Sequence, residues 1–160
     1  MATRLVHEMV YDAPAEAVAA MLSDPKFREE VCVAMNATTF TVTVDGGVDA
    51  KDVTIDMEQP TDRVPSFARK FVGETATVVQ KERWSSPTKG EITVSIPGKP
   101  GEMRGTATLV EKDGSTTELV DMEIKVKIPL VAGKLEDLLS KLLKSALKAE
   151  HRAGQAYLAR

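Results

Sequence analysis

The hydrophobic period of the chain changes at Pro129, and this change limits the possible folds more than any other feature. Before it, residues 120–128 alternate apolar and charged side chains, which is typical of a strand with one buried face. After it, apolar residues recur with the 3.6-residue period of a helix along 130–157. A helix of about 28 residues would be roughly 40 Å long. It is therefore long enough to cross a whole small domain.

The part of the chain before Pro129 predicts short helices and strands. Pro14 and Pro25 each suit the first position of a helix, since the N–H that proline lacks is unpaired there, and apolar spacing predicts two short helices near 14–22 and 25–35. Phe67 and Phe71 lie one helical turn apart, which favours a helical turn over 65–71. Alternating apolar residues predict strands in the segments 4–11, 40–44, 53–57, 74–84, 92–96, 103–109 and 120–128.

The connections between these strands have hairpin length, and strands do not alternate with helices, which excludes a parallel sheet. We therefore expect an α+β fold in a single domain, residues 1–160. It should have a curved antiparallel sheet of about six to seven strands, two short helices after the first strand, and the long helix across the concave face. A chain of 160 residues can bury a core without a disulfide or a structural metal.

Composition narrows the choice of environment and partners. Cys32 is the only cysteine, so an intrachain disulfide and a thiolate metal cluster are both excluded. The chain begins without the apolar run of a signal peptide, and no stretch approaches the roughly 20 apolar residues of a membrane span. We therefore expect a cytoplasmic protein that does not insert stably into membranes.

Several segments carry a resemblance to a known superfamily. Residues 11–18 (YDAPAEAV) and 22–25 (LSDP), together with the order of elements, resemble the opening of the SRPBCC or START-like helix-grip superfamily, which includes pollen allergens and polyketide cyclases. Residues 81–84 (KERW), Gly105, residues 113–116 (DGST) and above all 128–136 (IPLVAGKLE) look closest to a bacterial branch of unassigned function. The resemblance implies an apolar cavity between sheet and long helix, commonly used for lipids, sterols or other lipophilic molecules. Some members are cyclases or aromatases, and others bind protein partners.

Ten apolar side chains are the expected wall of that cavity, although ordinary core packing explains each of them individually. Methionine suits either role, because it is flexible and adapts to irregular spaces. The expected ligand is a lipid, a sterol-like or a polyketide-like molecule. The candidate ligand-binding residues are Met57, Phe67, Phe71, Trp84, Ile92, Met103, Met122, Ile124, Leu138 and Leu142.

Residues that could perform acid–base chemistry are few. Glu82 shares a strand face with Trp84, so it points inward if Trp84 does, and its partner should then come from another strand. The alternative is a carboxylate at the strand end that is exposed or held in a simple ion pair. His7 shares a face with Leu5 and Met9 and is either a hydrogen-bonded core histidine or a polar group in a cavity. His151 is expected to point toward solvent.

No cofactor or metal is expected, because the sequence has no Gly-rich phosphate loop, no G-x-S-x-G serine and no histidine pair with metal-ligand spacing. Residues 130–160 carry a net charge of +3 in a chain whose net charge is −3. With Tyr157 as its only aromatic residue, this segment does not suit nucleic acid. Its basic residues form either a solvated helix face or a surface for an acidic partner or a membrane. A protein partner would bind through Lys141, Lys144 and Lys148. The function expected from the sequence is thus non-catalytic binding of a lipophilic small molecule. A cyclase- or hydratase-like enzyme and a protein-interaction domain are the alternatives.

Overall fold

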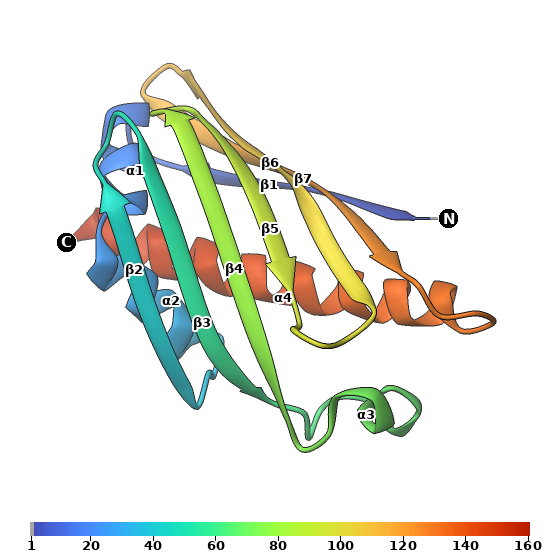
Figure 1. Ribbon diagram of the computed structural model, residues 1–160. Coiled ribbons are helices and arrows are strands. Elements are labelled where there is room, and N and C mark those ends of the chain that lie inside the picture. Colours follow the sequence, from blue (N-terminus) through green and yellow to red (C-terminus); the bar gives the residue numbers. More distant parts are fainter. Residues whose placement is uncertain (1) are drawn as a thin grey trace.

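A computed structural model describes residues 2–160 of the protein. It contains seven strands and four helices (Figure 1). The strands are β1 (Thr3–Tyr11), β2 (Thr39–Gly46), β3 (Lys51–Pro60), β4 (Thr75–Ser86), β5 (Lys89–Ser95), β6 (Gly101–Lys112) and β7 (Ser115–Val126). The helices are α1 (Ala15–Leu22), α2 (Pro25–Ala34), α3 (Ser66–Val72) and α4 (Ala132–Ala159).

All seven strands form one antiparallel sheet in the order β1-β7-β6-β5-β4-β3-β2. The first strand therefore pairs with the last, and α1 and α2 fill the connection that leads to the far edge. In Figure 1 the sheet curves over α4, which runs along its length, while α1 and α2 lie near the C-terminal end of α4. The α+β helix-grip architecture expected from the sequence is confirmed, including the two short helices, the helical turn at α3 and a long helix of 28 residues.

Polar contacts fasten α4 at both of its ends. Near its start, buried Glu136 accepts hydrogen bonds from the Thr3 hydroxyl at 2.9 Å and from the Val126 N–H at 3.0 Å, which joins the helix to β1 and β7. Near its end, the Tyr157 hydroxyl donates to Asp24 at 2.6 Å. Because Asp24 also caps the N-terminus of α2, this contact joins α4 to α2.

His151 does not point freely into solvent, so that expectation was wrong. Its Nε2 donates to the carbonyl of Val10 at 2.8 Å, and its ring meets the ring of Tyr11 edge-on, with centroids 5.2 Å apart. The helical stripe alone could not reveal this contact, because the edge strand β1 extends past the side of α4.

The apolar interior consists of three clusters. The largest lies between the sheet, α1, α2 and α4 and contains the fully buried Phe27 and Trp84. A second, around Cys32 and Met57, joins α2 to β2 and β3. The third, around Ala68 and Leu135, joins α3 to the first half of α4, and Leu139 contacts both this cluster and the largest one.

Cys32 is buried as expected, and burial raises the pKa of its thiol to about 11. Within residues 2–160, none of the helices combines the length and the apolar character needed to cross a bilayer.

Gly154 is a close contact between α4 and β1 that a larger residue should disturb. A Cβ at this position would lie 2.6 Å from Cε1 of the buried Tyr11 ring, whereas a Cβ at Gly133 in the same helix meets nothing within 4 Å. We expect Gly154→Ala to lower the free energy of unfolding by about 1–3 kcal/mol, because the core there has no room. Gly133→Ala should be neutral or stabilising by up to about 1 kcal/mol. Urea denaturation of both variants measures the difference, and equal values would refute the close contact.

Candidate functional site

Glu82 lies inside the molecule, on the concave face of the sheet. It is 5% exposed and occupies β4 between two inward-facing residues, Gln80 and Trp84. The Trp84 ring has room to lie against β5 because its partner on that strand is Gly90. A Cβ at Gly90 would come within 2.6 Å of the indole ring. The indole Nε1 then donates to Glu82 at 2.8 Å. The inward orientation inferred from the shared strand face is confirmed.

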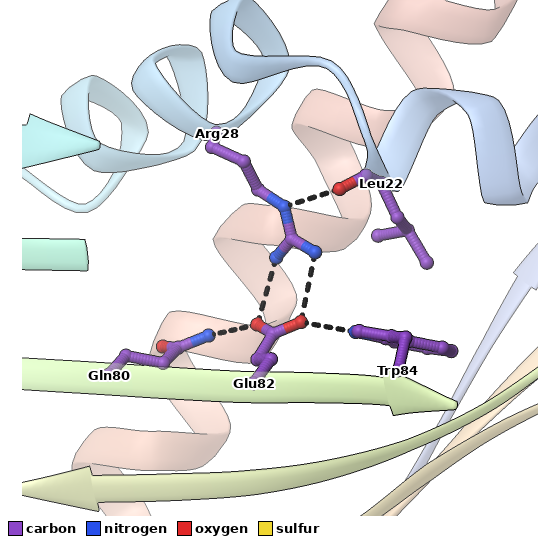
Figure 2. Close-up of polar contacts among 5 residues, drawn as sticks. All are labelled: Leu22, Arg28, Gln80, Glu82 and Trp84. Carbon is purple, nitrogen blue, oxygen red and sulfur yellow. Dashed lines mark hydrogen bonds and ion pairs between the residues drawn. The ribbon is translucent and has the colours of Figure 1, made fainter. Parts of the chain in front are cut away.

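The partner of Glu82 is Arg28, a buried residue of helix α2. Two nitrogens of the guanidinium donate to the two carboxylate oxygens of Glu82 at 2.9 Å each, and its Nε donates to the carbonyl of Leu22 at 2.9 Å (Figure 2). Gln80 adds a fourth hydrogen bond to the carboxylate at 2.5 Å. The expectation that the partner comes from another strand was wrong, because the partner, Arg28, lies on helix α2 and its side chain points toward the sheet.

These contacts keep the Arg28–Glu82 pair ionised. Burial alone would raise the pKa of Glu82, but the charge of Arg28 and the hydrogen bonds from Arg28, Trp84 and Gln80 hold that pKa below its usual value. Burial likewise opposes the charge of Arg28, and Glu82 outweighs it. An ionised carboxylate with four hydrogen bonds is a structural anchor, so Glu82 is poorly suited to donate or accept a proton in a reaction.

Three further buried ionisable side chains surround this pair: Lys51 on β3, Glu118 on β7 and Glu150 on α4. Each is no more than 6% exposed. Together with Arg28 and Glu82 they form what we call the polar centre. Its members come from five different elements, so only the folded chain brings them together.

The carboxyl groups of Glu118 and Glu150 favour their neutral forms. Burial raises the pKa of Glu150 to about 7. Burial also raises the pKa of Glu118 well above its ordinary value, and the nearby charges of Glu150 and Glu82 raise it further. Lys51 shifts in the opposite direction, since burial and the charge of Arg28 lower its pKa to about 8. Such perturbed groups in one place are typical of functional sites.

Two atoms of the polar centre have no hydrogen-bond partner within residues 2–160: Nζ of Lys51 and Oε1 of Glu118. The ammonium of Lys51 lies 4.8 Å from the centroid of the Trp84 ring, so a cation–π contact is its main interaction. Glu118 is flanked on the neighbouring strands by Met9 and Leu109, which offer no hydrogen-bonding oxygen or nitrogen from their side chains. Buried polar atoms normally have partners, so these two are the exceptions to explain.

His7 lies apart from the polar centre. Its Nε2 is also buried without a partner among the described residues, and burial, together with the charges of Lys144, His151 and Lys148 on the facing helix, lowers the pKa of the ring. The neutral ring faces α4 rather than Glu82, so the structure does not bring the two acid–base candidates together. Within residues 2–160, the polar centre included, no three His, Cys, Asp or Glu residues are grouped so that they could hold a metal ion.

The ten candidate ligand-binding residues are divided among the three apolar clusters and the surface of α4. Trp84, Ile92, Met103, Met122 and Ile124 belong to the largest cluster, and Met57 to the one under α2. Phe67, Phe71 and Leu138 are half-buried in the cluster under α3. Leu142 is 41% exposed on α4. Their role in binding stays a prediction.

The surface has two hollows. The first has a cavity volume of about 410 Å³ and opens beside the β2–β3 turn, lined by Asp45, Ala50, Lys51, Asp52, Arg83, Trp84 and Ser85. The second, of about 440 Å³, lies on α2 around Glu29 and Val33. Lys51, a member of the polar centre, and the neighbouring Trp84 both line the first hollow. The part of the polar centre around Lys51 therefore lies next to solvent.

Sequence reasoning missed most of the polar centre, although two members carried a signal. Glu118 has the same strand parity as Val120 and Met122, and Glu150 follows Ala146 by one helical turn. Both therefore had to point inward. Arg28 and Lys51 had no such signal, because long basic side chains are usually solvated.

Removing the charge of Glu82 should destabilise the fold strongly. Glu82→Gln would leave Arg28 buried without its counter-ion, and we expect the free energy of unfolding to fall by about 3–5 kcal/mol. The exposed pair of Arg83 and Asp52, on the other face of the same two strands, is the control, and Asp52→Asn should cost less than about 1 kcal/mol. Chemical denaturation of both variants tests this, and similar losses would contradict the assignment of Glu82 as the anchor.

Stability should depend on pH through Glu150. Its folded-state pKa of about 7 lies above the ordinary value of 4.5, so its stabilising effect is complete below about pH 4.5 and is lost as the pH rises through 7. Replacing it by glutamine should flatten this part of the stability curve, by up to about 3 kcal/mol between pH 5 and pH 8. Glu123→Gln, an exposed change on β7, should leave the curve unchanged. Denaturation measured across this range decides, and an unaltered slope in Glu150→Gln would count against a protonated Glu150.

Solved structures with the same fold have little sequence identity to this chain. The protein TTHA0849 from Thermus thermophilus is 17% identical with a TM-score of 0.66, over 97% of this chain and 99% of that one. A START superfamily protein from Mycobacterium smegmatis is 13% identical with a TM-score of 0.59, over 96% and 95%. Norcoclaurine synthase from Thalictrum flavum is 14% identical with a TM-score of 0.63, over 100% and 88%. These similarities show the fold, which is the START-like helix-grip fold expected from the sequence.

No curated protein matches the chain. Residues 6–158 match a family described as "Protein of unknown function (DUF2505)". Since this match spans nearly all of the chain, the protein belongs to that family.

Proposed function

We propose that the protein binds a lipophilic small molecule between the sheet and the first half of α4. The observation that carries this proposal is the incomplete burial of an apolar helix face. Leu138, Leu139 and Leu143 are half-buried, and Leu142 is 41% exposed, although all four lie in the middle of a helix that is fastened at both ends. Apolar surface that the protein itself leaves partly uncovered is available to an apolar ligand.

The packing of α4 explains why this face is open. The second half of the helix packs against α1, α2 and β1, where Leu147, Ala149 and Gly154 are buried. The first half contacts the end of β7 through Glu136. It also shares the third apolar cluster with the short helix α3, whose Phe67 and Phe71 remain half-buried beside Leu138. We therefore place the entrance at α3.

The segment of α3 contributes little to the buried core. Its seven residues contribute one fully buried side chain, Ala68, so that lifting it costs little apolar burial. Arg69 donates to the backbone carbonyls of Thr61, Asp62 and Val64, which holds the segment together internally rather than to the sheet.

Norcoclaurine synthase is by its name an enzyme, so catalysis in this interior is the second candidate function. The observation that favours it is Glu118, a buried carboxyl group whose pKa is raised and whose Oε1 is unpaired, which suits a proton donor. Interaction with a protein through the exposed Lys141, Lys144 and Lys148 stays a prediction.

An apolar fluorescent probe tests the binding function. N-phenyl-1-naphthylamine should bind with a blue-shifted emission, and Leu142→Asp and Phe71→Asp should each weaken its affinity at least tenfold, about 1.4 kcal/mol, because a carboxylate would enter the apolar face. Val33→Asp, a change at a 62% exposed valine on α2, is the control and should have no effect. Absence of probe binding, or equal losses in all three variants, would refute the proposal.

A further inference from the structure

We propose that the polar centre binds the carboxylate of a lipophilic carboxylic acid, whose apolar part lies along α4 toward Leu142. The inference rests on the proposed binding function and adds the chemical class of the ligand. Its geometric basis is the pair of unpartnered buried atoms, Nζ of Lys51 on β3 and Oε1 of Glu118 on β7, two strands of the same sheet that are separated by β6, β5 and β4.

Both unpartnered groups can donate a hydrogen bond to an oxygen acceptor. The Lys51 ammonium can only donate hydrogen bonds, and the protonated carboxyl of Glu118 can also donate one. The carboxylate of Glu82 cannot satisfy them, because its two oxygens are already used by Arg28, Trp84 and Gln80. A ligand carboxylate has two acceptor oxygens and would suit two donors that approach from different strands.

The charge balance favours an anion rather than a neutral head group. Below neutral pH, burial favours the neutral forms of Glu118 and Glu150, so the cations Arg28 and Lys51 outnumber the anion Glu82 and the centre has an excess of positive charge. Tyr11, which faces the two carboxyl groups from β1, stays neutral because burial raises the pKa of its hydroxyl. An uncompensated buried charge is unfavourable, and a ligand carboxylate would neutralise it.

The distance along α4 sets the size of the apolar part. Leu142 and Glu150 are about two helical turns apart, or roughly 12 Å. Leu143 and Leu147 lie between them and belong to the largest apolar cluster. A medium-length alkyl chain could therefore extend from the polar centre to the exposed face at Leu142. Leu139, which contacts two clusters, continues this apolar surface toward α3.

The same charges predict how binding depends on pH. Between pH 6.5 and 8.5 Glu150 loses its proton, with a pKa of about 7, and Lys51 loses its charge, with a pKa of about 8. Each of these two changes makes the centre less positive. An anionic ligand should accordingly bind well at pH 6.5 and poorly at pH 8.5.

Competition by decanoate and 1-decanol for bound N-phenyl-1-naphthylamine tests the inference, since the two compounds share a chain length and differ in charge. At pH 6.5 decanoate should bind at least tenfold more tightly than decanol, and most of this advantage should be lost at pH 8.5. Lys51→Met should abolish the advantage without reducing decanol affinity, because methionine keeps the apolar stem and its volume. Lys81→Met, at an exposed position on β4, should leave it intact. Glu150→Gln should preserve more of the advantage at pH 8.5.

The possible outcomes separate this inference from the binding function. If the probe and both compounds fail to bind, the proposed function itself is wrong. If decanol and decanoate bind equally, or if Lys51→Met leaves the preference for decanoate unchanged, the fold binds apolar molecules but the polar centre is an internal network that ligands do not reach. A thermal melt of each variant confirms that it is folded, so that loss of binding cannot be attributed to unfolding.

Discussion

The ion pair between Arg28 and Glu82 is the interaction on which the rest of the interior depends. A guanidinium and a carboxylate removed from water are tolerated only with close geometry and further hydrogen bonds, and this pair has both. The bidentate contact sets the position of α2 over β4, and the carbonyl of Leu22 holds the guanidinium from the α1–α2 turn (Figure 2). Trp84 is oriented by the same carboxylate. One buried pair thus connects two helices to the middle of the sheet.

The buried pair also determines the state of the groups around it. The charge of Arg28 lowers the pKa of both Glu150 and Lys51. The negative charge of Glu82 raises the pKa of Glu118. The polar centre is therefore close to a balance between neutral and charged forms near neutral pH. Burial makes each of these effects large, because few water molecules are present to screen them. A charged group that enters such an interior changes the protonation states of the polar centre. The proposal therefore specifies the sign of the ligand's charge and not only its apolar character.

The two halves of helix α4 differ in how closely they are packed. Its second half has small residues, such as Gly154 against Tyr11, that allow close approach to β1. Its first half presents leucines that the sheet does not fully cover, and the short helix α3 covers them only in part. This difference follows from the curvature of the sheet in Figure 1, which a straight helix cannot follow along its whole length. The proposed entrance and the proposed polar site consequently lie toward opposite halves of the same helix.

The sequence by itself determined the order of elements, the antiparallel sheet and the length of α4, because the periods of two and 3.6 residues are local properties of a chain that buries one face. It also determined which side chains point inward, Glu82 from Trp84 and, in principle, Glu118 from Val120. Only the tertiary structure decided what these side chains meet. Arg28 and Glu82 are 54 positions apart, and the contact of His151 with Val10 spans 141. No local pattern encodes such pairings, since they depend on how the sheet curves and where the helices pack. The pKa values, which depend on burial and on neighbouring charges, arise only once that packing is complete.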